Sequence, residues 1–243
     1  IAKPVCNELN IPLIGRYIHI ESNKKEEKDR AELVGKYFCD DFKSIDLTKH
    51  FNTLKNLDEI DNEERTYNEY DYQDKRIRLG NIKARTRIVY LYNLASKNGG
   101  LVLSTDNLTE YYLGFWTLHG DVGDFGLIQN LWKNEVHELT LFLTRKLNEE
   151  GKRILSKCSL ANATDGLGIS ETDLDQIMPD WRERHDTTAS GYKEVDIKLN
   201  SYLESIKKRE NIKKFEDDPI IERHRSSFFK RLNPENIERE ELI

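Results

Sequence analysis

The chain has 243 residues, 37% of them hydrophobic, and its 44 acidic and 38 basic side chains give a net charge of −6. This balance argues against nucleic acid or an anionic membrane as a partner, so a phosphate-bearing ligand needs a local basic site. No apolar run approaches the roughly 20 residues of a membrane span, and three widely spaced cysteines form neither a metal knuckle nor a disulfide framework. We therefore expect a globular cytoplasmic chain.

The first part of the sequence alternates strand-like and helix-like segments. Residues 12–20 are apolar and β-branched, which predicts a buried strand, and the apolar spacing over 24–42 predicts a helix with one buried stripe. Residues 44–47 suit the next strand. A second amphipathic stretch at 48–60 precedes a polar, acidic segment at 61–74, which we expect to be an exposed loop.

The next segments repeat the alternation. Residues 75–97 have a long helical pattern that Asn98-Gly99-Gly100 should end, and 101–104 should be an interior strand. Three later segments follow: one or two helices at 133–157, a polar stretch at 161–191 and a mostly charged helix at 192–230. Strands alternating with helices predict an α/β fold, a parallel sheet flanked by helices, with ligands bound beyond the carboxyl ends of the strands.

The best candidate site comes directly after the strand at 101–104. Asp106 is placed to cap the next helix, and Glu110, four residues later, shares its face. Two carboxylates at a strand end suit Mg²⁺. The alternative is an ordinary helix cap with an acid in the first turn, and the spacing alone favours that alternative.

Two other segments could contact a polar ligand. The run from Gly120 to Gly126 holds three glycines and two aspartates, typical of a tight loop that can approach a polar ligand, but the run alone favours a plain turn. The segment from Arg76 to Arg87 concentrates five basic residues on one helix, either as a solvated face or as an anion site. The six histidines show no paired spacing, so zinc chemistry is not expected.

Together and in order, these segments resemble the NAD synthetase family of N-type ATP pyrophosphatases. The resemblance covers roughly residues 75–234 and implies a Rossmann-like fold of the adenine nucleotide alpha hydrolase type, as a single domain over 1–243 with a charged helical C-terminal segment at about 192–243. The matching motifs are Gly80-Asn-Ile-Lys-Ala-Arg85-Thr-Arg87, Thr105-Asp106 to Glu110, Gly120-Asp121-Val-Gly-Asp124, Lys133, Ala163-Thr164-Asp-Gly-Leu167 and Phe229-Lys230-Arg231.

The resemblance implies a reaction and a set of roles. ATP and ammonia would convert nicotinate adenine dinucleotide to NAD through an adenylated carboxylate, with release of pyrophosphate and AMP, in a homodimer. The implied residues are Thr105, Lys133 and Thr164 for ATP, Glu110 for Mg²⁺, and Arg85, Asp124 and Lys230 for the dinucleotide. No catalytic residue is assigned, because the S-G-G-x-D-S loop and the strand before it, which cradle pyrophosphate in the family, are expected upstream of Ile1.

Three departures from the family pattern lie on the substrate side. The chain has Leu118 where the family has lysine, Val122 where it has glycine, and Phe229 where it has histidine. Nicotinate mononucleotide or another acceptor therefore stays open as the substrate, as does a catalytically silent nucleotide-binding relative.

Overall fold

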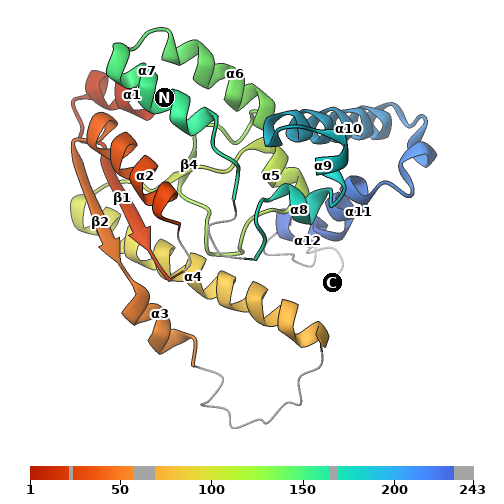
Figure 1. Ribbon diagram of the computed structural model, residues 1–243, viewed down its shortest axis with the longest axis horizontal. Helices are drawn as coiled ribbons and strands as arrows, with labels where there is room; N and C mark the ends of the chain where they lie inside the picture. The colour runs from red at the N-terminus through yellow and green to blue at the C-terminus, as the bar shows by residue number, and fades with distance from the viewer. Residues whose placement is uncertain (22–23, 57–68, 165–168, 233–243) are drawn as a thin grey trace, which may run out of the picture.

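The structure is a computed structural model that describes residues 1–21, 24–56, 69–164 and 169–232, with side chains from Lys75 onward in the helix that begins at Glu69. It confirms an α/β fold with short parallel sheets flanked by helices (Figure 1). Among the helices it describes, none has the length and apolarity needed to cross a membrane.

The elements follow one another along the chain as α1 (Ala2–Leu9), β1 (Ile14–His19), α2 (Lys25–Phe38), β2 (Asp41–Asp46), α3 (Thr48–Leu54), α4 (Glu69–Asn98), β3 (Leu103–Ser104), α5 (Leu108–Leu113), β4 (Phe125–Gly126), α6 (Lys133–Thr144), α7 (Glu149–Ser159), α8 (Leu174–Ile177), α9 (Trp181–Arg184), α10 (Thr188–Lys208), η2 (Ile212–Phe215), α11 (Pro219–Ser226) and α12 (Phe228–Arg231).

The first sheet is a parallel pair, β1 and β2, connected by α2. Strand β1 confirms the expected strand at 12–20, but the helix expected over 24–42 ends at Phe38, because Cys39 is extended with φ −94° and ψ 147°. Phe42 therefore belongs to β2. A Cβ atom on Gly35 would lie 2.0 Å from Cδ2 of Phe42, so the glycine lets α2 approach this ring.

One hydrophobic core lies between this sheet and α4. Ile18, Ile20, Leu47 and Phe51 are buried there, and apolar side chains of α4 pack against them. Helix α4 confirms the helix expected at 75–97 and ends as predicted, with Gly99 in the left-handed region at φ 63°. The loop expected at 61–74 lies partly outside the described residues, and it is wrong for 69–74, which belong to α4.

The second sheet is shorter than expected. Strand β3 covers only Leu103–Ser104 and, within the described residues, has one hydrogen-bonded neighbour, the parallel β4, so the interior strand at 101–104 is not found. The side chain of Asp124 accepts a hydrogen bond from Val102 N at 2.8 Å, and Asp124 N donates to Val102 O at 2.7 Å. The carboxylate of Asp124 thus accepts the hydrogen bond that Val102 N would otherwise donate to the backbone of a neighbouring strand.

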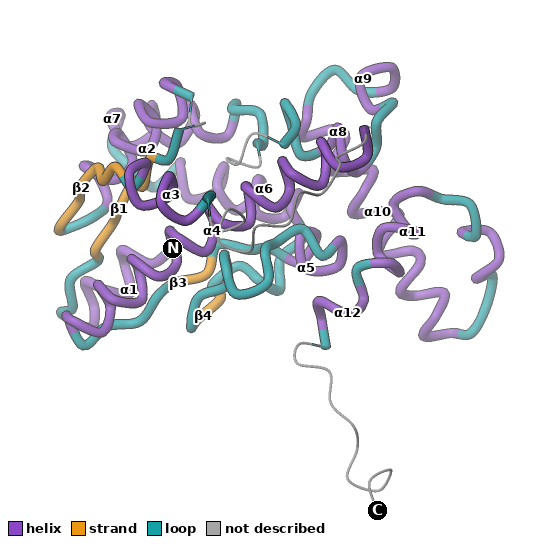
Figure 2. Tube along the Cα trace, turned by 90° about the horizontal axis from the view of Figure 1, so that it is seen from below, coloured by secondary structure: helices purple, strands orange, loops and turns teal. Residues whose placement is uncertain are grey.

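A second core is formed by the C-terminal helices. Tyr192, Val195, Leu199 and Tyr202 recur every three or four residues along α10 and are all buried. The segment at 161–191 is polar on average, yet it adds α8 and α9 with buried apolar side chains to this core. Figure 2 shows β1 and β2 at one end of the molecule and α10 and α11 at the other, with α4 and α5 between them.

Candidate functional site

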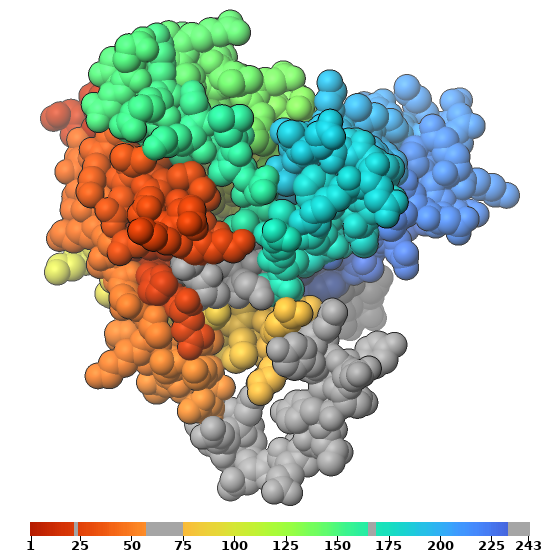
Figure 3. All heavy atoms as spheres, viewed as in Figure 1, coloured from red at the N-terminus to blue at the C-terminus, as the bar shows by residue number. Residues whose placement is uncertain are grey.

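A cavity of about 590 Å³ lies beyond the carboxyl end of β3, lined by residues of α4, α5, α6, α8, α11 and α12 and of the segments between them. In Figure 3 the side chains of α4 are visible in a recess between the N-terminal elements and the α8–α9 segment. Five of the seven residues assigned by resemblance line this cavity: Thr105, Glu110, Lys133, Thr164 and Lys230.

The start of α5 presents two acids to the cavity in different ways. Asn107, not Asp106, caps the helix, since its side chain accepts a hydrogen bond from Glu110 N at 3.1 Å. Glu110 completes a capping box by accepting from Asn107 N at 3.0 Å. Asp106 instead accepts from Ser104 Oγ at 2.8 Å, which draws it towards the strand and corrects the predicted cap.

Glu110 also forms an ion pair across the cavity. Lys133 Nζ lies 2.6 Å from Glu110 Oε1, and both side chains are less than one-fifth exposed. Burial alone would lower the pKa of Lys133, but the charge of Glu110 and its hydrogen bond raise it overall. Lys133 is therefore held as a cation at the cavity wall.

Carboxylates make this wall suitable for Mg²⁺. Burial raises the pKa of Asp106 to about 6, and the nearby charges of Glu110 and Asp121 add to the shift. A divalent cation would relieve this repulsion. No cluster of three or more possible metal-ligating side chains occurs in the described part of the chain, so Mg²⁺ at this wall would need phosphate and water oxygens as its other ligands.

Desolvated cations face the same cavity. Burial lowers the pKa of Lys230 to about 8, and Lys230 Nζ donates to Gly114 O at 2.7 Å and to Trp116 O. Arg87 and Arg223 also line the cavity, and burial lowers the pKa of both. Cations in such surroundings attract anionic ligands more strongly than exposed ones do.

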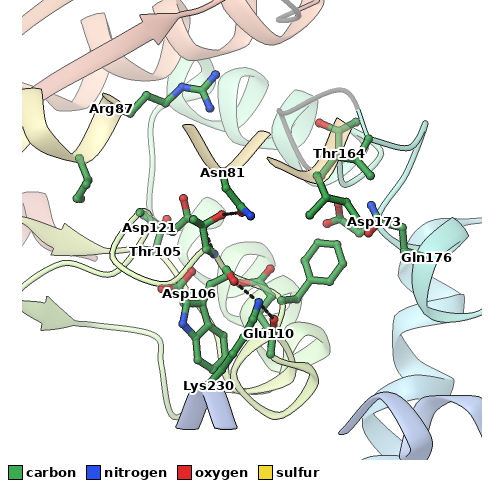
Figure 4. Close-up of a pocket in the computed structure, with 18 of the residues that line it drawn as sticks. Asn81, Arg87, Thr105, Asp106, Glu110, Asp121, Thr164, Asp173, Gln176 and Lys230 are labelled. Carbon is green, nitrogen blue, oxygen red and sulfur yellow. Dashed lines mark hydrogen bonds between the residues drawn. The ribbon is translucent and has the colours of Figure 1, made fainter. Parts of the chain in front are cut away.

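The far wall comes from the segment before and within α8. Thr164 Oγ1 donates to Glu27 Oε1 at 2.8 Å, which connects this wall to α2. Figure 4 shows Thr164, Asp173 and Gln176 on one side of the cavity and Thr105, Asp106 and Asp121 on the other.

Arg85 and Asp124, the other two residues assigned by resemblance, do not line this cavity. Arg85 is exposed and donates from Nε to Leu118 O at 3.2 Å. Asp124 holds β4 against Val102. Their predicted contacts with substrate stay predictions.

Several residues of the cavity were not assigned from the sequence. Asn81, Arg87 and Asp121 lie within the motifs that were recognised, so choosing the loop's first aspartate over its second would have found Asp121. No sequence pattern distinguished Arg223, because it lies in a helical segment with many charged residues.

A second cavity of about 690 Å³ adjoins the first and shares Asp106, Trp116 and Lys230 with it. Tyr111 and Trp116 line this cavity and stack with an interplanar angle of 3° and a centroid distance of 5.8 Å. Aromatic faces next to a cation suit a ligand that carries both a ring and an anionic group.

The sequence model of the family described as NAD synthase matches residues 13–234. The NH(3)-dependent NAD(+) synthetase of Thermoplasma acidophilum is 41% identical over 103 residues, 42% of this chain and 39% of the relative. That of Finegoldia magna is 29% identical over 208 residues, 84% of this chain and 77% of the relative. The matched part of the chain thus spans about two fifths of the Thermoplasma relative's length.

A solved structure, that of NMN synthetase from Francisella tularensis, is similar over 95% of this chain and 80% of that chain. Its TM-score is 0.63 and its sequence identity 20%, so it supports the fold alone.

Proposed function

Because the chain belongs to the NAD synthase family, we propose that it catalyses the ATP-dependent amidation of nicotinate adenine dinucleotide to NAD with ammonia, releasing AMP and pyrophosphate. The protein would be a cytoplasmic carbon–nitrogen ligase. The observation that supports this most is the common cavity of Thr105, Glu110, Lys133, Thr164 and Lys230, drawn from segments up to 125 residues apart in sequence, from 105 to 230.

The proposed chemistry needs anionic groups brought together. A carboxylate is a poor electrophile, so one of its oxygens first attacks the α-phosphorus of ATP and pyrophosphate leaves. Ammonia then attacks the carbonyl carbon of the adenylate, and AMP leaves with that oxygen. Lys133 and the desolvated Lys230, Arg87 and Arg223 would hold and neutralise the phosphates.

Mg²⁺ would be held by Glu110 with Asp106, and when bound it would offset charge on the phosphates. Thr105 and Thr164 line opposite walls, so their hydroxyls would orient ATP between them. The adjoining cavity, with Tyr111 and Trp116, would take the second substrate.

A homodimer is part of the same proposal. Val89 on α4 and Phe125 on β4 are 68% and 55% exposed, and a second copy would cover such apolar side chains.

Nicotinate mononucleotide is the second candidate substrate. Leu118 and Val122, two of the departures from the family pattern, both line the second cavity, and the third, Phe229, is 54% exposed. Changes on the wall of the second cavity would alter how the half of a dinucleotide that lies farther from ATP is held. The residues assigned to ATP line the first cavity and would be unaffected.

The test is product analysis with the full-length protein, ATP, ammonia and either acceptor. We expect NAD, AMP and pyrophosphate from the dinucleotide. Formation of ADP and phosphate would contradict the pyrophosphatase chemistry, and amidation of the mononucleotide alone would overturn the dinucleotide assignment. ATP binding without turnover of either acceptor would indicate a silent relative.

A further inference from the structure

Asp196 lies on α10, outside both cavities, and is only 6% exposed. Its two carboxylate oxygens accept hydrogen bonds from two other elements. Thr109 Oγ1 of α5 donates to Oδ1 at 2.5 Å, and Asn134 N of α6 donates to Oδ2 at 2.9 Å. Asp196 therefore joins three helices at one point.

Thr109 and Asp196 accept hydrogen bonds from the first backbone N–H groups of α6. The first N–H groups of a helix lack partners within the helix, and the side chain of the N-cap residue Trp132 makes no capping hydrogen bond. Lys133 N donates instead to Thr109 Oγ1 at 2.9 Å, and Asn134 N donates to Asp196. The negative charge of Asp196 also lies where the helix dipole favours it.

Lys133 is the residue whose backbone this arrangement fixes. Its ammonium reaches Glu110 at 2.6 Å and lies 5.1 Å from the centroid of the Tyr192 ring, on the same helix as Asp196. The Lys133 side chain thus extends into the cavity from a backbone whose N–H groups on either side of its Cα, Lys133 N and Asn134 N, are both hydrogen-bonded.

We propose that Asp196 is a positioning residue, which anchors the first turn of α6 through Thr109 and Asn134 so that the Lys133 ammonium faces the phosphates of ATP. This inference rests on the proposed function, because it takes ATP as the ligand of the cavity. A purely structural Asp196 would hold the helices together without any selective effect on phosphate binding.

The experiment compares ATP and adenosine as ligands by calorimetry in the presence of Mg²⁺, with thermal unfolding of each variant alongside. Asp196→Asn and Thr109→Val should each weaken ATP binding by about tenfold or more, since each loses hydrogen bonds that orient a charged group. Adenosine, which has no phosphate, should bind as it does to the parent. Thr109→Ser keeps the hydroxyl and should restore ATP affinity.

Tyr202→Phe is the matched control. It removes another side-chain hydrogen bond of α10, the part-buried one that Arg225 Nε donates to the tyrosine hydroxyl at 3.0 Å, away from both cavities. This variant should bind ATP like the parent, even where its melting temperature falls.

Several results would overturn the positioning role. ATP affinity equal to the parent in Asp196→Asn and Thr109→Val would do so, and so would equal losses for ATP and adenosine. If Asp196→Asn does not fold, the Thr109→Val and Thr109→Ser pair decides the question. A parent protein that binds no ATP would overturn the proposed function itself. A parent that binds ATP, with variants that bind it equally well, would overturn only the role of Asp196.

Discussion

Glu110 has three interactions that bear on its role. It closes the capping box of α5 through Asn107, pairs with Lys133, and lines the cavity beside Asp106. The sequence left open whether Glu110 is a metal ligand or a first-turn acid, and the structure shows that the capping geometry does not remove it from the cavity wall.

Glu110→Gln separates these roles. The amide oxygen can still accept from Asn107 N, so the helix cap should survive, while the charge that would hold Mg²⁺ and that pairs with Lys133 is lost. We expect turnover at saturating ATP to fall by about a hundredfold or more, with an altered magnesium dependence. The measurement is turnover across a magnesium titration, together with thermal unfolding.

Glu135→Gln is the control for this variant. Glu135 has the equivalent position in the first turn of α6, where it accepts from Trp132 N at 2.9 Å, and it does not line the cavity. Its neutralisation should cost about 0.3–1 kcal/mol of unfolding free energy and leave turnover intact. Equal turnover in the two variants would reduce Glu110 to a capping residue.

Lys230 gives a pH dependence whose sign follows from burial. Its pKa is lowered from 10.5 to about 8, so the ammonium loses its proton as the pH rises through 8. Affinity for the anionic substrate should fall between pH 7 and pH 9, whereas Lys230→Arg should bind equally across this range, as measured by calorimetry. A pH-independent affinity in the parent would remove Lys230 from the binding site.

The fold does not weaken over the same range on account of Lys230. Because the pKa is lower in the folded state, the unfolded state binds the proton more tightly between pH 8 and pH 10.5. The contribution of Lys230 to the free energy of unfolding therefore rises with pH between pH 8 and pH 10.5. Weaker substrate binding at high pH would thus come from the lost charge of the ammonium and not from a weaker fold.

At the scale of elements, periodicity predicted the long helices better than the short strands. Helix α4 repeats its pattern over many turns and ends at a glycine, so its C-terminal end was predictable. The end of α2 was not, because Phe42 continues the apolar spacing of the helix although it belongs to β2. Strand β3 is two residues long, and its partner β4 is a two-residue strand in a glycine-rich segment that no local pattern identifies as a strand.

Helix α10 should contribute to stability through one face. Leu199 is fully buried among the C-terminal helices, whereas Ile197 on the same helix is 57% exposed. Leu199→Ala should lower the free energy of unfolding by about 2–5 kcal/mol, and Ile197→Ala should change it by less than about 0.5 kcal/mol. Urea unfolding measures both, and similar losses in the two variants would place α10 differently in the fold.

At the scale of the whole molecule, the sequence predicted the part of the site that lies within recognisable motifs. Thr105 and Glu110 were found because they follow a predicted strand, and Lys133 was found through the resemblance to the family. Arg223 and Asp196 were not found, because their contacts are made only by folding: Arg223 Nε reaches Leu113 O at 3.3 Å across 110 residues, and Asp196 reaches Thr109 across 87. Side chains of charged helices look alike in sequence until their partners are known.

The central claim is that a carboxylate oxygen of the acceptor attacks the α-phosphorus of ATP in this cavity. Nicotinate adenine dinucleotide labelled with ¹⁸O in its carboxylate, together with ATP and ammonia, tests this step directly in the full-length protein. One labelled oxygen should appear in AMP, detected by mass spectrometry, because AMP leaves with the oxygen that it acquired from the carboxylate. Unlabelled AMP formed alongside NAD, or label in inorganic phosphate, would contradict the adenylate mechanism.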